Sequence, residues 1–298
     1  MKLPTFLIIG VQKAGTTSIY NYLAQHPEIY MSPVKETNFL TKLWSEQEIA
    51  QRKRNPVKIS TFEQYCQLFE AAKDNQEVGE ASPNYLFKYQ SSAECIKHYL
   101  PNAKLIAVLR NPIERAYSDY LMHIRDAINS RSLTEHIQST NSFTIRKGFY
   151  YKQLQYFFNQ FEHRQFGIFL YDDLRQDAIK FMQNMYEFIG VDKAFVPDTS
   201  KVHQVAQAPK VGALNTALRK SDRIIAPIRP LMKTIFPPSL RERLHSLRVK
   251  LIAMNSTREI PPLSKENHQQ LLALYQDDIL KLQDLIQRDL SAWLAMPD

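Results

Sequence analysis

Residues 6–18 read FLIIGVQKAGTTS, and they pass from an apolar run through two glycines into a helical pattern. Gly10 and Gly15 have the spacing of a loop that wraps backbone N–H groups around a phosphate at a helix N-terminus. Glycine suits such a loop because a side chain would block the close approach of the backbone. A glycine-rich turn without a ligand is the alternative. The stretch predicts a buried strand, an anion-binding loop and a helix.

The residues around this loop lack the usual magnesium ligands. A P-loop NTPase continues with Lys-Ser/Thr, whose lysine reaches the terminal phosphates and whose hydroxyl binds magnesium. Here Thr16 and Thr17 follow Gly15, and the lysine lies inside the loop as Lys13. The apolar run 104–109 is followed by Arg110, not by a magnesium-holding aspartate. We expect an anion site without a metal site, and a P-loop kinase or NTPase is the alternative enzyme class.

Further apolar runs predict the rest of a sheet. Residues 104–109 and 166–171 are nearly continuous in apolar character, and weaker candidates are residues 28–32 and 77–81. Such runs are typical of a parallel sheet that is covered on both faces. Helical patterns separate the runs at residues 17–26, 61–72, 93–99, 113–128 and 150–161. This alternation predicts an α/β fold with a parallel central sheet flanked by helices.

The sequence changes character after about residue 200, where apolar strand-like runs stop. We expect residues 1–298 to form a single domain, with an α/β core over 1–205. Residues 206–298 are expected to be mostly helical and basic. They end in an amphipathic helix from about 265 to 293, whose apolar positions recur at three- and four-residue steps.

Composition excludes several classes of protein. The chain has 298 residues, of which 44% are hydrophobic and 23% charged, so a disordered or collagen-like chain is excluded. The two cysteines, Cys66 and Cys95, are too few for a disulfide framework and favour a reducing compartment. No apolar run approaches the roughly 18 residues that a membrane-spanning helix needs. We expect a cytoplasmic protein.

The net charge of +8 is concentrated in residues 219–258, where ten Lys/Arg stand against two acidic residues. The rest of the chain is balanced, which argues against a nucleic-acid partner. Within residues 240–251 four leucines fall on one helical face, and basic residues flank it on both sides. This pattern suits a helix at a membrane surface, so we expect peripheral membrane contact. A core-packed helix with solvated basic edges, and a non-catalytic basic module that binds membranes or nucleic acid, are the alternatives.

A second anion site is expected after the run 104–109. Arg110 leaves the end of that strand, where open α/β sheets bind ligands, and its guanidinium offers a planar fork to a phosphate. Ser118 lies two turns along the following helix and offers a hydroxyl to the same group. An ion pair with Glu114 or Asp119 is the alternative for Arg110. Two anion sites predict a ligand with two separated phosphate-type groups.

These residues carry a family resemblance. GVQKAGTTS (10–18) and LRNPIERAYSDY (109–120) resemble the motifs of sulfotransferases that depend on 3′-phosphoadenosine 5′-phosphosulfate (PAPS). The bacterial and heparan-sulfate-type branch is the most similar. Further motifs of the resemblance are KETNFL (35–40), GEASPNYL (79–86), GFYYKQL (148–154), YDDL (171–174) and DLSAW (289–293). The resemblance implies a P-loop-NTPase-like sulfotransferase fold and spans nearly the whole chain.

The resemblance also implies roles for residues. The 5′-phosphosulfate would bind to the loop, at Lys13, Ala14, Gly15, Thr16, Thr17 and Ser18. Lys13 would stabilise the leaving phosphate oxygen, and Arg110 with Ser118 would bind the 3′-phosphate. Lys210, in a loop over 201–212, is expected to close over PAPS. The product would be adenosine 3′,5′-bisphosphate (PAP), and no metal is expected.

The acceptor needs a base, and Glu36 in KETNFL matches the catalytic glutamate of the heparan-sulfate-type enzymes. A surface pair with Lys35 is the alternative for Glu36, and His26, His98 and His123 are alternative bases. Ala81 stands where those enzymes place a lysine, which puts recognition of a sulfated polysaccharide in doubt. The expected acceptor is a glycan, a glycolipid or a secondary metabolite, sulfated on a hydroxyl or an amine.

Overall fold

The computed structural model describes residues 2–41, 59, 61–126, 131–139, 141–200, 208–209, 243, 246–247, 256–257 and 260–296. The chain divides into two compact units. Unit 1 comprises Met1–Arg115, Phe149–Gln204 and Tyr275–Ala295. Unit 2 comprises Ala116–Gly148, Val205–Leu274 and Met296–Asp298. The expected single domain, with its division near residue 205, stays a prediction.

Unit 1 contains a five-stranded sheet in the order β2-β3-β1-β4-β5, and all its neighbouring strands pair in parallel. The strands are β1 (Phe6–Gly10), β2 (Ile29–Met31), β3 (Glu77–Ala81), β4 (Lys104–Leu109) and β5 (Phe166–Leu170). Every residue of β1 is buried, as the apolar run predicts. The predicted fold class, a parallel sheet flanked by helices, is confirmed.

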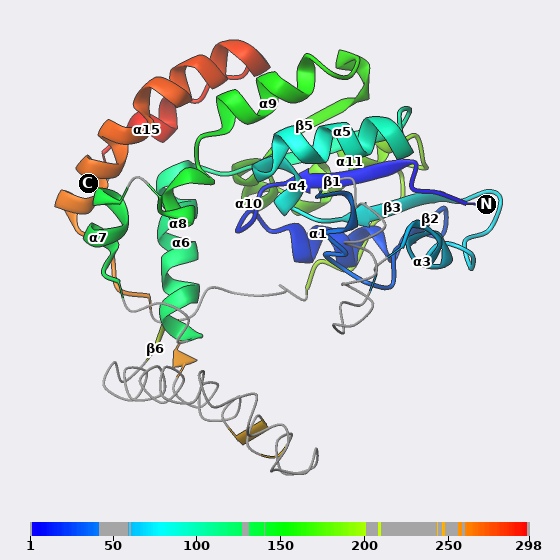
Figure 1. Ribbon diagram of the computed structural model, residues 1–298, viewed down its shortest axis with the longest axis horizontal. Coiled ribbons are helices and arrows are strands. Elements are labelled where there is room, and N and C mark those ends of the chain that lie inside the picture. The colour runs from blue at the N-terminus through cyan, green and yellow to red at the C-terminus, as the bar shows by residue number, and fades with distance from the viewer. Residues whose placement is uncertain are drawn as a thin grey trace. The chain divides into compact units, whose positions relative to one another are not determined.

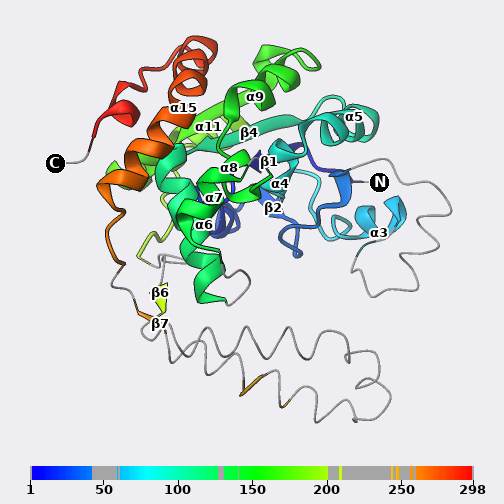
Figure 2. The ribbon, with the colours of Figure 1, turned by 60° about the vertical axis from the view of Figure 1, so that its left-hand side comes forward.

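Helices of unit 1 cover this sheet. They are α1 (Thr16–Leu23), α3 (Phe62–Gln67), α4 (Asn84–Phe87), α5 (Tyr89–Tyr99), α9 (Tyr150–Phe158), α10 (Tyr171–Gln176) and α11 (Ala178–Ile189). Figure 1 shows α5 and α9 on one side of β1 and α1 on the other, and Figure 2 shows α5 and α9 again on one side. Unit 1 also contains short 3-10 helices. Two have three residues, at Phe39–Thr41 and His163–Gln165, and one has four, at Ser291–Leu294.

Two long helices contribute residues to both units. Helix α6 (Pro112–Arg125) crosses the boundary at Arg115, and α15 (Lys265–Ile286) crosses it between Leu274 and Tyr275. Within unit 2, α7 (Leu133–Gln138) follows a capping box in which Ser132 and Glu135 bond each other's backbone N–H groups. Helix α8 (Phe143–Arg146) is a single turn. The predicted C-terminal helix is present as α15.

The structure corrects the expectation that strands stop near residue 200. Ala208–Pro209 (β6) and Ser256–Thr257 (β7) form a short antiparallel pair in unit 2. Lys210 lies outside the described residues, and so does most of the basic segment 219–258 with its leucine face. Cys66 and Cys95 are both buried and free, in agreement with the exclusion of a disulfide framework.

Candidate active site

The residues that the sequence singles out in unit 1 gather at one edge of the sheet. Because all five strands are parallel, their carboxyl ends share that edge. The glycine loop follows β1, Glu36 follows β2, and Arg110 follows β4. In open α/β sheets the crevice outside the carboxyl ends of the strands binds the ligand. The expected donor loop, the base and one phosphate-binding arginine thus belong to one edge of unit 1.

The loop between β1 and α1 has the backbone of an anion-binding turn. Gly15 caps α1 with a left-handed φ of 74°, and no side chain caps this helix end. A Cβ added at Gly15 would lie 2.9 Å from Leu174 Cδ2 and 3.0 Å from Tyr171 Cε2. Lys13 also has a positive φ of 75°. The first N–H groups of α1 lack partners within the helix, so the turn suits an anionic oxygen there.

Arg110 joins this loop to the end of β4. Its Nη1 donates to the Lys13 carbonyl at 3.0 Å, and its Nε and Nη2 donate to Glu114 Oε2 at 3.2 and 2.9 Å. The ion pair expected as the alternative is therefore present. These bonds use three of the five guanidinium N–H donors, and among the described residues no partner takes the other two. Arg110 can keep Glu114 and still offer two donors to a phosphate.

Two tyrosines support Arg110: Tyr171, which has no role assigned from the sequence, and Tyr150, which was expected to line the adenosine or acceptor pocket or to lie in the core. The Arg110 guanidinium lies over the Tyr171 ring, 4.8 Å from its centroid. Tyr150, buried at the start of α9, donates its hydroxyl to the Arg110 carbonyl at 2.9 Å. Both tyrosines belong to motifs of the sequence, YDDL and GFYYKQL. Tyr171 directly follows β5, and Tyr150 begins α9. The arginine is thus fixed at both its backbone and its side chain.

Glu36 occupies a tight turn after β2. Its φ is 60°, its N–H donates to the Ala81 carbonyl at 2.9 Å, and its side chain is 40% exposed. Lys35 Nζ donates to Glu36 Oε1 at 2.7 Å, so the surface pair expected as the alternative also forms. A half-exposed carboxylate on the carboxyl edge remains accessible to an acceptor.

The alternative histidine bases have other surroundings. His26 is buried, its Nε2 lies 2.9 Å from the Asp192 carbonyl, and its Nδ1 accepts the Glu28 N–H at 3.1 Å. Both its ring nitrogens are therefore engaged in the fold. His98 is exposed near the end of α5, next to the start of β4, at the opposite edge of the sheet. His123 belongs to unit 2, where its Nδ1 lies 3.4 Å from Thr144 Oγ1. In unit 1, Glu36 lies at the carboxyl edge of the sheet with an accessible side chain, whereas His26 and His98 do not.

Ser118, the second residue expected at the 3′-phosphate, is buried on α6 within unit 2. Ala14, Thr16 and Ser18 are buried in unit 1, while Thr17 is half-buried. No group of three or more His, Cys, Asp or Glu side chains in the described part of the chain could hold a metal ion. None of the described helices combines the length and apolar character needed to cross a membrane.

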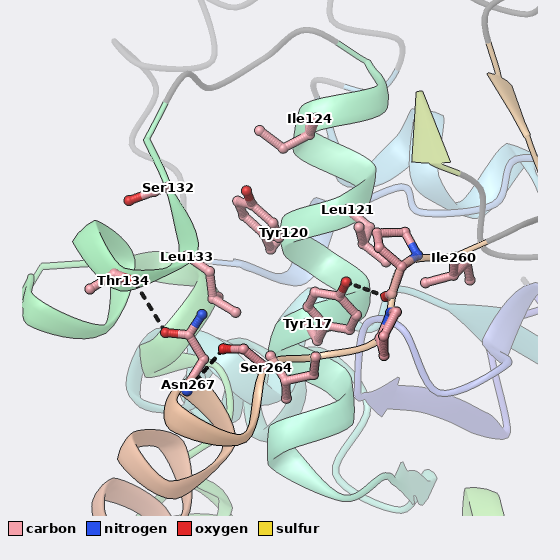
Figure 3. A pocket seen from close by; sticks show the side chains of 13 residues that line it. Tyr117, Tyr120, Leu121, Ile124, Ser132, Leu133, Thr134, Ile260, Ser264 and Asn267 are labelled. Atoms are coloured by element: carbon pink, nitrogen blue, oxygen red, sulfur yellow. Dashed lines mark hydrogen bonds between the residues drawn. The ribbon is translucent and has the colours of Figure 1, made fainter. Parts of the chain in front are cut away.

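Unit 2 has an open pocket of its own, with a volume of about 720 Å³ (Figure 3). Tyr117, Tyr120, Leu121 and Ile124 form one wall along α6. The Tyr117 hydroxyl donates to the Pro261 carbonyl at 2.5 Å, and the Thr134 hydroxyl lies 3.1 Å from the Asn267 amide oxygen. Rings, prolines and a few polar groups give the pocket an amphipathic lining.

The chain matches the model of a family described as "Sulfotransferase family" over residues 4–195. That range contains the glycine loop, Glu36, Arg110 and the entire five-stranded sheet. The chain belongs to the sulfotransferase family. The resemblance that the two anion-site motifs predict is therefore confirmed.

A sulfotransferase of known structure shares this fold along the whole chain. The crystal structure of a sulfotransferase from Alicyclobacillus acidocaldarius is 25% identical and superimposes with a TM-score of 0.70. The match covers 99% of this chain and 100% of that protein. The predicted sulfotransferase fold is thus confirmed for the parallel sheet and the C-terminal helix α15.

Curated relatives extend the comparison to carbohydrate enzymes. Human carbohydrate sulfotransferase 15 is 28% identical over 295 residues, which cover 78% of this chain and 50% of that protein. Human bifunctional heparan sulfate N-deacetylase/N-sulfotransferase 2 is 28% identical over 64% of this chain and 22% of its own length. This sulfotransferase chain spans about half the length, or less, of these relatives.

Proposed function

We propose that this chain transfers the sulfuryl group of PAPS to a hydroxyl or amine of an acceptor, by in-line displacement without a metal ion. The observation that carries the proposal is the bond between Arg110 Nη1 and the Lys13 carbonyl. It ties the glycine loop after β1 to the arginine after β4, at neighbouring strand ends. Two adjacent anion sites fit a donor that has a phosphosulfate and a separate phosphate.

The residues of the carboxyl edge fit this donor. The uncapped start of α1 and the left-handed Gly15 leave the loop backbone open to the 5′-phosphosulfate. Lys13 supplies positive charge where the leaving oxygen develops negative charge, which is electrostatic stabilisation of the transition state. Arg110 supplies two further N–H donors for the 3′-phosphate. A hydroxyl of Ser118 is proposed, from the sequence alone, for the same group. Lys210 is proposed, from the sequence, to close over the donor.

Glu36 accepts the acceptor's proton in the proposed reaction. The acceptor oxygen or nitrogen forms a bond to sulfur while the bond from sulfur to the 5′-phosphate oxygen breaks, and PAP leaves. A carboxylate within hydrogen-bond reach of the acceptor can take that proton as a general base. The exposed edge of Glu36 suits this role, whereas the engaged nitrogens of His26 do not.

The acceptor that the comparisons support is a carbohydrate. Both curated relatives described above have names that refer to carbohydrate or heparan sulfate as their acceptor. We therefore propose a glycan or glycolipid, with a secondary metabolite as the further possibility. Peripheral membrane contact through residues 240–251 and a cytoplasmic location are proposed from the sequence alone.

The test is incubation with labelled PAPS and a panel of glycans, glycolipids and small hydroxyl compounds, followed by detection of PAP and of the labelled product. We expect PAP release that depends on an acceptor and persists in EDTA. Lys13→Ala should reduce turnover by about 10²–10³-fold. Magnesium-dependent transfer from ATP, with no release from PAPS, would instead identify a kinase or NTPase. Tight RNA or liposome binding without turnover would identify a non-catalytic module.

A further inference from the structure

Glu80 is a buried carboxylate on β3, the strand next to the one that Glu36 follows. It is the fourth residue of β3, and none of its surface is exposed. Four hydroxyl groups donate to it, two on each oxygen. Oε1 accepts from Ser82 Oγ at 2.5 Å and Thr37 Oγ1 at 3.0 Å, and Oε2 accepts from Tyr85 Oη at 2.9 Å and Tyr65 Oη at 3.2 Å. No Lys, Arg or His among the described residues forms an ion pair with it.

This arrangement suits the ionised acid. A carboxylate has about four lone-pair positions, and four hydroxyls occupy them. A protonated carboxyl would have to donate one hydrogen, and one of the four hydroxyls would lose its acceptor. Burial raises the pKa of Glu80, and the hydroxyls of Ser82, Tyr85, Thr37 and Tyr65 oppose that rise. The acid is thus balanced by hydrogen bonds and not by a cation.

Three of the four hydroxyls also accept hydrogen bonds from consecutive backbone N–H groups. Asn38 N donates to Ser82 Oγ at 3.1 Å, and Phe39 N donates to Thr37 Oγ1 at 3.2 Å. Leu40 N donates to Tyr85 Oη at 3.2 Å. Each hydroxyl has one proton, so a hydroxyl that donates to Glu80 must present its lone pairs elsewhere. Because Glu80 accepts the proton of each of the three hydroxyls, their oxygen lone pairs point toward the backbone N–H groups of residues 38–40.

The backbone that is held in this way follows Glu36 directly. Glu36 and Asn38 have φ values of 60° and 49°, and Asn38 Nδ2 donates to the Glu36 carbonyl at 3.0 Å. Left-handed residues other than glycine are strained and persist when their surroundings determine them. The hydroxyls around Glu80 provide such surroundings. Strand β3, next to β2 in the sheet, thereby fixes the turn that carries the base.

We propose that Glu80 is a positioning residue, which acts through Ser82, Thr37 and Tyr85 to hold residues 36–40 so that Glu36 meets the acceptor. Glu80 does not itself take the proton, because it is fully buried. The inference rests on the proposed function, in which Glu36 is the base. It predicts that the network governs turnover and leaves donor binding unchanged, since Arg110 bonds Glu114 and the Lys13 carbonyl and not the network.

The first test substitutes the acid. Glu80→Gln should lower kcat by about 10²-fold, the size of effect expected when a reacting group is misplaced by about 1 Å. The affinity for PAP, measured by calorimetry, should stay within about twofold, because binding of the donor uses other residues. Glu77→Gln is the matched control, because Glu77 starts the same strand at the opposite edge of the sheet and bonds Thr5. A normal kcat in Glu80→Gln would overturn the proposal.

A double variant separates positioning from general stability. If Glu80 acts through Glu36, then Glu36→Gln combined with Glu80→Gln should be no slower than Glu36→Gln alone. If the rate losses of the two single variants multiply in the double variant, Glu80 acts independently of Glu36. That result would overturn the inference. If Glu36→Gln alone keeps normal turnover, the assignment of the base fails instead, and that result is distinct.

The third test does not depend on activity and covers the case that Glu80→Gln fails to fold. Tyr85→Phe removes a hydroxyl that bonds both Glu80 and Leu40 N, while Tyr65→Phe removes one whose bond is to Glu80 and not to the turn. Hydrogen exchange at residues 38–40 should become at least about 10-fold faster in Tyr85→Phe, as local opening becomes easier. It should change little in Tyr65→Phe. Equal protection in both variants would overturn the proposal.

Discussion

At the scale of single residues, the candidate site depends on Arg110. Its guanidinium bonds Lys13 and Glu114 and stacks on Tyr171, while Tyr150 holds its carbonyl. Such a residue is pre-organised, so little side-chain freedom is lost when a phosphate binds. Its removal should therefore affect binding more strongly than the removal of a mobile surface arginine.

We predict that Arg110→Ala abolishes sulfate transfer and weakens PAP binding by about 10-fold or more, because charge-assisted hydrogen bonds to the phosphate are lost. Calorimetry with PAP measures this, and circular dichroism checks the fold. Arg164→Ala is the control, since Arg164 lies exposed before β5 at the opposite edge and pairs with Glu162. Undiminished binding of PAP to Arg110→Ala would contradict the 3′-phosphate assignment.

We predict that Glu36→Gln reduces turnover with the true acceptor by about 10²-fold or more, the usual contribution of a general base. PAP affinity should be retained, because the amide keeps the size of the side chain and the donor is bound elsewhere. Single-turnover kinetics with saturating PAPS measures the effect. Near-normal turnover would remove Glu36 as the base and direct attention to His123.

The roles of Arg110, Glu36 and the loop could be predicted at this scale because each stands at the end of a strand in a motif. The role of Glu80 could not be. Its four hydroxyl partners come from α3, the turn after β2 and the segment after β3, and their meeting depends on the sheet order. A local pattern carries no information on such pairings.

At the scale of elements, β1, β4 and β5 were predictable from nearly continuous apolar runs. The signals for β2 and β3 were weaker, because β2 has only three residues and β3 contains Glu77 and Glu80. Helix α11 was not predicted, although Asp177 caps its start and the left-handed Gly190 ends it. Its buried residues Phe181, Met182, Met185, Tyr186 and Ile189 also recur at helical spacing. Helix α3 ends at Gln67, although its helical pattern extended to residue 72. Turns follow the helix there.

The start of helix α9 gives a pH-dependent prediction. Asp278 Oδ2 accepts the N–H groups of Tyr150 and Tyr151 at 2.8 and 3.2 Å. Burial raises the pKa of Asp278 from 3.8 to about 6, although these backbone bonds lower it. Between those pH values the native state holds a proton that the unfolded state has released. The free energy of unfolding should therefore fall as pH rises through this range.

Urea unfolding at several pH values between about 4 and 7 measures this effect. In Asp278→Asn the amide oxygen can still accept both N–H groups, but the titration is gone, so the fall with pH should be smaller than in the wild type. Asp277→Asn is the control, because Asp277 is the exposed neighbour on the same helix. An identical pH profile for wild type and Asp278→Asn would contradict the prediction.

At the scale of the whole molecule, unit 1 is assembled from three separate stretches of the chain. The third stretch, Tyr275–Ala295, supplies buried Tyr275, Ile279 and Leu282. It also contributes ion and hydrogen-bond partners to α10, because Arg288 pairs with Asp173 and Trp293 Nε1 donates to Asp172. The sequence indicated a long amphipathic helix here. Its membership in the same unit as the sheet depends on contacts distant in sequence.

We predict that Leu282→Ala lowers the free energy of unfolding by about 2–5 kcal/mol, because the removal of a buried side chain leaves a cavity. Leu280→Ala, at a position that is 41% exposed on the same helix, should change it by less than about 0.5 kcal/mol. Chemical unfolding of the two variants measures the difference. Equal effects would mean that the C-terminal stretch contributes no core to unit 1.

The saturated carboxylate of Glu80 has a consequence for the history of this chain. If one of its four hydroxyl donors is lost, an acceptor position becomes vacant in the core, and if the acid is lost, four buried hydroxyls need new partners. Single changes at these five positions should therefore destabilise the core. Across related sequences we expect Thr37, Tyr65, Glu80, Ser82 and Tyr85 to be inherited as a block, kept together or replaced together.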